Sequence, residues 1–402
     1  MNEIKATRIL GAPKAEFTNP IKDVYTARLP IAGCAWVETT EGVVLIDTIA
    51  RVDVGREVFK KIEGSIKYII YTHGHGDHVG GAAAYLKDNP EIIASEYLPD
   101  RFDKYKMLAP YRAHITAVQF NIPEIVSTPE FVYPTKTFLG DMTIKLGDKT
   151  FELHAVRAET DDAVWVYIPE LKAAFIGDLV IAGLPNVGNP WKPTRFALDW
   201  ARALEDVRAL NPEHVFCNGA GYYYTGERAL KILDLNIAAI RNLHDQVVEH
   251  INKGTHITDM IHEIKLPEHL AKDPYLRPLY SRTEFFVFNV YRWYHGYFDG
   301  NIAHLLPRPE REVMGELNKL IGDPEKIIKR AKELLDKDQA QLALEVLDVL
   351  IQADPENIEA RRVRIELLKK LGANDYCLMS RNAWVYYIDK DRKYIDSKSK
   401  KK

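Results

Sequence analysis

The stretch that decides the fold is Tyr71-Thr-His-Gly-His-Gly-Asp-His-Val-Gly-Gly81, which places three histidines and an aspartate within six residues. The apolar run Lys67-Tyr-Ile-Ile-Tyr71 comes just before it and predicts a buried strand. The segment Gly80-Gly-Ala-Ala-Ala-Tyr-Leu86 follows and predicts the start of a helix. The four polar residues are therefore expected on a loop between a strand and a helix.

The spacing of His73, His75, Asp77 and His78 favours a metal site. In an extended segment, residues i and i+2 point the same way, so His73 and His75 can bind one ion, while Asp77 and His78 can face a second position beside it. Imidazole and carboxylate are ligands that Zn²⁺, Fe²⁺ and Mn²⁺ prefer. The alternative is a solvated loop in which Asp77 caps a helix. Histidine is scarce, at 13 in 402 residues, so this clustering favours the metal site.

The pattern His-x-His-x-Asp-His after a strand resembles the signature of the metallo-β-lactamase superfamily. The resemblance implies an α/β fold, an αββα sandwich that holds one or two metal ions at one edge. Residues 32–38 and 42–47 are predicted strands separated by a turn, and they are similar to the first hairpin of that fold. Asp47 matches the acidic residue that ends the hairpin and is expected to support the histidine loop, unless it merely begins a turn.

Two further strand pairs are predicted at residues 142–156 and 163–176. The resemblance places Glu159 where most superfamily members have a third metal-binding histidine, and Asp178 where they have a carboxylate that bridges two metals. A glutamate at the first place resembles the metallo-β-lactamase-type alkyl sulfatases. The alternatives are a carboxylate in an acidic loop for Glu159, where two neighbouring aspartates leave the register open, and a turn residue for Asp178.

One residue departs from the superfamily pattern. The last ligand of the superfamily is a histidine after a final strand, and Ala220 stands in the matching segment. The second metal would then be held by Asp77, His78 and Asp178, and three protein ligands plus water still make a workable open site. The alternatives are rescue by His214 or by a histidine of the second domain, a one-metal protein, and an inactive one.

Near residue 229 the composition changes from alternating strands to helical periodicity. An amphipathic helix is predicted at residues 229–252 and a shorter one at 257–264. Residues 323–371 predict three helices that look like a tetratricopeptide pair, with too few repeats for an independent peptide-binding array. The segment Tyr297-Phe-Asp-Gly-Asn301 is similar to a motif of the helical dimerisation domain that follows the catalytic domain in alkyl sulfatases.

These observations predict three parts of the chain. Residues 1–228 are expected to form a metallo-β-lactamase-fold catalytic domain. Residues 229–390 are expected to form an all-α, alkyl sulfatase dimerisation-like domain with a TPR-like helix pair, through which the chain forms a homodimer. Residues 391–402 are rich in lysine and are expected to be a basic disordered tail.

The composition excludes several classes of protein. The 54 basic and 57 acidic residues give a net charge of −3, without the basic excess of a nucleic-acid-binding protein. Three scattered cysteines are too few for a disulfide framework and fit a reducing compartment. The N-terminus lacks the apolar core of a signal peptide, and no apolar run is long enough to span a membrane. We therefore expect a cytoplasmic protein.

The function predicted from these features is hydrolysis of a small-molecule ester, above all a sulfate ester, by metal-activated water. One or two Zn²⁺ ions are the expected cofactors, with Fe or Mn as alternatives, and Asp77 and Asp178 are the expected catalytic carboxylates. Candidate sulfate contacts are cationic, because an anion needs charged donors nearby, and an aromatic residue could line an apolar pocket. These candidates are Arg157, Lys192, Arg195 and Tyr223.

Two other functions remain open from the sequence. The same ligand set would permit hydrolysis of a lactone, a thioester or a phosphodiester. Ala220 favours a binding or scaffold protein with a degenerate site that acts through its helices. Six intact polar ligands argue against the scaffold, because burying idle polar groups is costly. The cationic candidates could also be ordinary surface charges, and Tyr223 could belong to the core.

Overall fold

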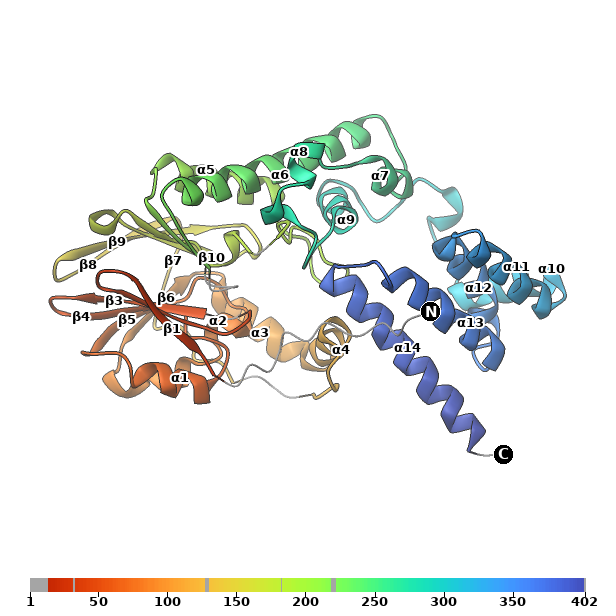
Figure 1. Cartoon of the computed structure of the whole chain (residues 1–402), viewed down its shortest axis with the longest axis horizontal. Coiled ribbons are helices and arrows are strands. Elements are labelled where there is room, and N and C mark those ends of the chain that lie inside the picture. Colours follow the sequence, from red (N-terminus) through yellow and green to blue (C-terminus); the bar gives the residue numbers. More distant parts are fainter. Residues whose placement is uncertain (1–13, 32, 127–129, 182, 218–221, 401–402) are drawn as a thin grey trace. The chain divides into compact units, whose positions relative to one another are not determined.

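A computed structural model describes residues 14–31, 33–126, 130–181, 183–217 and 222–400 of the chain (Figure 1). The described residues fall into two compact units. The first unit takes in the described residues within 14–113 and 126–295, and the second takes in those within 114–125 and 296–400.

The first unit contains two sheets, and the first sheet has seven strands among the described residues. They follow chain order: β1 (Glu16–Ile21), β2 (Val24–Arg28), β3 (Gly33–Thr39), β4 (Gly42–Ile46), β5 (Ile66–Ile70), β6 (Glu91–Ser95) and β7 (Lys136–Phe138). Strands β1 to β4 are an antiparallel meander, and β4 to β7 are parallel. The parallel half matters for the site, because the carboxyl ends of β4, β5 and β6 lie at one edge.

The second sheet has six strands in the order β13-β12-β11-β10-β9-β8 within the described ranges. They are β8 (Asp141–Leu146), β9 (Lys149–Val156), β10 (Ala163–Ile168), β11 (Ala173–Phe175), β12 (His214–Cys217) and β13 (Tyr222–Thr225). All pairs are antiparallel except β11 with β12. Since β9 and β11 both flank β10 in the opposite direction, they run parallel to each other and end at the same edge.

Side-chain alternation places the two sheets in the middle of four layers. On β3, Ala35 and Val37 face the core shared by both sheets, while Trp36 faces the core under the outer helices. Helices α1 (Val52–Phe59) and α3 (Leu98–Met107) cover the first sheet. Helices α5 (Ala197–Ala209) and α6 (Glu227–Asn252) cover the second sheet (Figure 1). The predicted αββα sandwich is confirmed.

The helices that follow residue 229 pack within the first compact unit, up to His295. They are α6, α7 (Ile257–Glu263), α8 (Glu268–Ala271) and α9 (Thr283–Tyr294). Their apolar faces share one hydrophobic core with the second sheet, in which Leu243 and Phe286 lie with Trp165. The first compact unit therefore includes these helices as well as the two sheets. Helical periodicity identified the elements correctly but did not show which core would bury them.

The second unit is all helical in its described residues after Gly296, as expected. Its longer helices are α10 (Glu310–Ile321), α11 (Pro324–Asp336), α12 (Ala340–Ala353), α13 (Ile358–Gly372) and α14 (Leu378–Ser399). Helices α11, α12 and α13 match the three predicted helices and pack around a core that includes Ala331, Leu347 and Leu367. Side-chain caps at Asp323 and Asn357 fix the starts of α11 and α13.

The predicted disordered tail is instead the end of helix α14, which continues to Ser399. Asp391 is fully buried there and accepts hydrogen bonds from Arg361 at 2.5 Å and Arg364 at 2.7 Å. The Arg361 guanidinium also lies 4.0 Å from the ring centroid of Tyr394. Arg361 and Arg364 are distant from Asp391 in sequence, so the lysine-rich composition of residues 391–402 gives no indication of these contacts. Among the described residues, no helix combines the length and apolar character needed to cross a membrane.

Candidate metal centre

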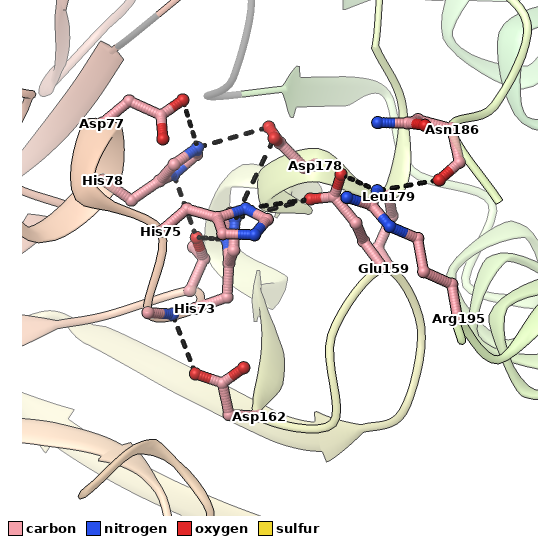
Figure 2. A network of polar contacts seen from close by, with 12 residues as sticks. His73, His75, Asp77, His78, Glu159, Asp162, Asp178, Leu179, Asn186 and Arg195 are labelled. Carbon is pink, nitrogen blue, oxygen red and sulfur yellow. Dashed lines mark hydrogen bonds and ion pairs between the residues drawn. The ribbon is translucent and has the colours of Figure 1, made fainter. Parts of the chain in front are cut away.

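The candidate ligands come from loops at the carboxyl ends of strands in both sheets. The histidine loop follows β5, and Asp47 follows its parallel neighbour β4. Glu159 follows β9 and Asp178 follows β11. The side chains of these loops meet in one cluster (Figure 2). Loops at the carboxyl ends of strands are where α/β sheets place their sites, because the strands hold them rigidly.

The histidine loop has a helix start earlier than predicted. Helix α2 (Gly76–Val79) has His75 as its N-cap residue, with an extended backbone and no side-chain cap. Asp77 lies in the first turn, so it is not the N-cap residue. This geometry leaves the His75 and Asp77 side chains available to the cluster, in agreement with the metal-site interpretation.

A glycine allows Asp178 to approach the histidine loop. Gly177 has a φ of +50°, and a Cβ atom there would lie 2.8 Å from the Oγ1 of Thr72. Both the backbone conformation and the close approach require glycine. The second sheet can therefore bring Asp178 beside the first sheet's loop.

Four ligand atoms form the first group. The Nε2 atom of His73 lies 2.8 Å from Nδ1 of His75. The Oε2 atom of Glu159 lies 3.5 Å from the former and 3.3 Å from the latter. Asp178 Oδ2 lies 3.9 Å from His73 Nε2. These atoms lie within 4.8 Å of one another, a set that could hold a metal ion.

The second group shares Asp178 with the first. His78 Nε2 lies 3.4 Å from Asp178 Oδ1 and 3.7 Å from Asp77 Oδ2. Because Asp178 presents Oδ2 to one group and Oδ1 to the other, it has the geometry of a bridging carboxylate (Figure 2). Ala220 lies outside the described residues. Nδ1 of His214, which was considered as a replacement ligand, lies 2.7 Å from the hydroxyl oxygen of Tyr223.

Asp47 supports the second group, as predicted. Its fully buried carboxylate contacts Nδ1 of His78 at 2.7 Å and accepts hydrogen bonds from the backbone N–H and hydroxyl of Thr72, both at 2.7 Å. A carboxylate on one ring nitrogen fixes the orientation of the imidazole and leaves the other nitrogen for a metal.

The two groups differ in the direction in which the pKa of the buried histidine is shifted. Burial lowers the pKa of His73 well below its usual value, and the other two histidines lower it further. Burial also opposes protonation of His78, but the carboxylates of Asp178, Asp47 and Asp77 raise its pKa well above its usual value. Burial raises the pKa of Asp178 to about 6. The second group is therefore richer in negative charge.

The donor set fits a divalent metal ion. Within the described part of the chain, His78 Nε2, Glu159 Oε2 and Asp178 Oδ1 are buried without a hydrogen-bond partner. A buried polar atom left unpaired typically costs about 1–3 kcal/mol. All three atoms point into the cluster, so a cation there would satisfy them together.

Of the four candidate substrate residues, the structure brings two toward the cluster. Arg195 is buried and pairs with Glu159 Oε1, while also donating to the backbone oxygen of Asn186 at 2.7 Å. Lys192 is half-buried, and burial together with Arg195 and Arg112 lowers its pKa to about 8.

The other two candidates have partners elsewhere. Arg157 is 50% exposed and pairs with Asp199 at 2.6 Å. The hydroxyl of Tyr223 contacts His214. Neither is among the groups that the structure gathers at the metal ligands.

Sequence reasoning missed two features near the cluster. Asp162, noted only as a source of register error, accepts a hydrogen bond from the backbone of the histidine loop. Tyr280 is affected by the site, since burial and then the charges of Glu159 and Asp77 raise its pKa. No sequence pattern points to Tyr280, which lies in the short segment between the 3-10 helix Pro274–Leu276 and helix α9. The composition of the acidic run 159–162 was the available signal for Asp162.

The sandwich with a buried histidine–carboxylate cluster at its edge is the arrangement that the sequence resemblance implied. Family comparison agrees, because a profile described as "Metallo-beta-lactamase superfamily" matches residues 32–219. A second profile, "Alkyl sulfatase dimerisation", matches residues 256–393. Residues 32–219 therefore match the metallo-beta-lactamase superfamily and residues 256–393 match the alkyl sulfatase dimerisation domain, which confirms the resemblance found in the sequence.

Individual relatives carry related names. The chain is 28% identical to a linear primary-alkylsulfatase of Pseudomonas sp., over 88% of this chain and 72% of that protein. It is 23% identical to the alkyl/aryl-sulfatase BDS1 of Saccharomyces cerevisiae, over 90% of this chain and 62% of the relative. The solved structure of the stereoselective inverting sec-alkylsulfatase Pisa1 from Pseudomonas sp. has a TM-score of 0.84, with 21% identity, over 94% of this chain and 66% of the other. This last likeness shows the fold.

Proposed function

We propose that the protein is a metal-dependent hydrolase of sulfate esters. The observation that carries the proposal is the convergence of unpartnered, buried ligand atoms from His78, Glu159 and Asp178 on one cluster. The substrate class is supported by the names of the relatives, which are all sulfatases. A small alkyl sulfate is the substrate that these names favour.

In this proposal, the first metal position is formed by His73, His75 and Glu159, and the second by Asp77 and His78, with Asp178 between them. Zn²⁺ suits this mixture of imidazole and carboxylate, and Fe or Mn are the alternatives. When bound, such ions supply Lewis acidity, which makes water a stronger nucleophile at neutral pH and stabilises the charge of the leaving sulfate.

The protein's own residues prepare the site for this chemistry. Asp47 holds the His78 ring so that Nε2 faces the cluster. Arg195 engages one oxygen of Glu159 and leaves the other for a ligand role. Lys192 is mostly protonated at pH 7, since its pKa is about 8, and can attract an anionic ester.

We further propose that the chain acts as a homodimer, which the dimerisation profile supports. The three cysteines are free and buried, in agreement with the reducing environment of a cytoplasmic protein. Size-exclusion chromatography with light scattering would separate a dimer from a monomer.

A substrate panel combined with a ligand variant tests the function. Purified protein loaded with Zn²⁺ should release sulfate from a primary alkyl sulfate, and Glu159→Ala should lose both bound metal and sulfate release. Glu57→Ala, on the exposed part of helix α1, is the matched control and should behave as wild type. If a lactone, thioester or phosphodiester is turned over faster than the alkyl sulfate, that compound class becomes the proposed substrate in place of the sulfate ester.

A second candidate is a scaffold protein with a degenerate site, which Ala220 in the sequence favours. Protein that binds no metal yet forms a stable dimer would support the scaffold and contradict the hydrolase.

A further inference from the structure

Asp162 joins the two metal-ligand loops of the first unit. It lies three positions after Glu159 and is 0% exposed. Its Oδ2 atom accepts a hydrogen bond of 2.8 Å from the backbone N–H of Gly74, the residue between His73 and His75 (Figure 2). A hydrogen bond therefore links the loop that carries Glu159 to the middle of the histidine loop.

A second contact holds the same two segments together. The backbone N–H of Val164, at the start of β10, donates to the oxygen of Thr72 at 2.7 Å. Thr72 and Gly74 flank His73, so this histidine is fixed on both sides by the segment that follows Glu159. Of the two contacts, only the one from Asp162 depends on a side chain and can be removed by substitution.

The fit around Gly74 leaves no room for adjustment. A Cβ atom at this position would lie 2.7 Å from Cδ of Arg101 and 3.0 Å from Oδ2 of Asp162. A side chain at this position would have to displace Arg101 and Asp162, so the close contact favours glycine. The loop thus lies directly against the side chains that hold it.

Arg101 balances the buried charge of Asp162. It is 8% exposed, and its Nε donates to Oδ1 of Asp162 at 2.7 Å. It also pairs with Asp161, whose side chain is 43% exposed, and donates to the hydroxyl of Tyr105 at 3.2 Å. A carboxylate paired with a charged guanidinium makes stronger hydrogen bonds than a neutral group does.

We propose that Asp162 is a positioning residue that sets the metal affinity of the first group by fixing the His73–His75 pair against Glu159. Arg101 keeps the Asp162 carboxylate in place. The inference rests on the proposed metal site, and it concerns a residue that is itself no ligand. Outer partners of this kind commonly change metal affinity by about 10–100-fold.

The adjacent aspartates provide a matched pair of variants, because both pair with Arg101 but only Asp162 contacts Gly74. The dissociation constant of Zn²⁺ is measured by competition with a chromogenic chelator, and thermal unfolding is measured without metal. We expect Asp162→Asn to weaken Zn²⁺ binding about 10-fold or more, since an amide has one acceptor oxygen and cannot serve both Gly74 and Arg101. Asp161→Asn should change binding less than about 3-fold, as expected for a half-exposed ion pair.

Each outcome has a distinct meaning. Equal Zn²⁺ affinity in wild type and Asp162→Asn overturns the inference, as does an equal loss in Asp161→Asn. A variant that unfolds earlier without metal but binds Zn²⁺ normally shows a purely structural role and also overturns it. If Asp162→Asn does not fold, Arg101→Lys replaces it and should weaken binding by a smaller factor. Wild-type protein that binds none of Zn²⁺, Fe²⁺ and Mn²⁺ overturns the proposed function as well.

Discussion

The two metal-ligand groups share Asp178 but are built differently. The first group draws its ligands from loops of both sheets, and Arg195 and Asp162 hold those loops from outside. The second group takes Asp77 and His78 from one loop, and the Asp77 side chain is 30% exposed. The first metal position is therefore preorganised by several elements, whereas the second depends mainly on Asp47 and the carboxylate of Asp178.

The largest effect is expected from removing the residue common to both groups. Asp178→Ala should lower the rate of sulfate-ester hydrolysis by about 1000-fold or more. The loss of stabilisation by the metal raises the activation free energy by several kcal/mol. Steady-state kinetics and metal analysis by mass spectrometry check this. Retention of both activity and metal would show that Asp178 does not bridge the groups.

A smaller and more selective effect is expected at the second group. Asp47→Ala releases Nδ1 of His78 and should weaken the second metal about 10–100-fold while sparing the first. Titration with Zn²⁺ should then show one tight and one weakened equivalent. Asp100→Ala, exposed on helix α3, is the control. Equal weakening of both equivalents would contradict the separation of the two groups.

A pH effect is expected from Lys192, whose pKa is lowered to about 8. Below that pH the side chain is charged and attracts an anionic ester, and above it the charge is lost. Bound metal ions add positive charge, so the transition occurs at or below pH 8. The kcat/KM for an alkyl sulfate should fall up to about 10-fold per pH unit above it.

Variants at Lys192 distinguish this explanation from metal loss at high pH. Lys192→Met should lower kcat/KM and abolish its decrease at high pH. Lys192→Arg should shift that decrease in kcat/KM to higher pH, since arginine stays protonated. An unchanged profile in both variants would assign the transition to another group.

The smallest effect is expected from Arg157, which pairs with Asp199 away from the ligands. Arg157→Ala should change kcat/KM less than about 3-fold and the free energy of unfolding by no more than about 1 kcal/mol, the usual range for an exposed ion pair. Enzyme kinetics and urea unfolding measure the two quantities. A selective rise in KM for sulfate esters would restore Arg157 as a substrate contact.

Local patterns predicted the elements and most of the cluster. Residues 32–38 and 42–47 were predicted as two strands around a turn, as the structure has them, and the spacing of the histidine loop indicated the candidate ligands. Glu159 and Asp178 were predicted because they follow strands in positions that resemble a known family. Each of these inferences needed only neighbouring residues or one family motif.

Contacts between distant segments could not be predicted in this way. Asp162 lies 88 residues from Gly74, and the sequence offers no pattern that pairs them. The partners of Asp391 lie on another helix, so the lysines nearby suggested disorder where a helix forms. The apolar faces of the helices after residue 229 pack against the second sheet, which helical periodicity could not indicate because it does not specify the packing partner.

The most direct test of the central claim is sulfate release from a primary alkyl sulfate by one protein sample in three states. We predict that the metal-loaded protein releases sulfate, that chelator treatment abolishes the release, and that added Zn²⁺, Fe²⁺ or Mn²⁺ restores it. No release by the metal-loaded protein, or release unaffected by the chelator, would contradict the account.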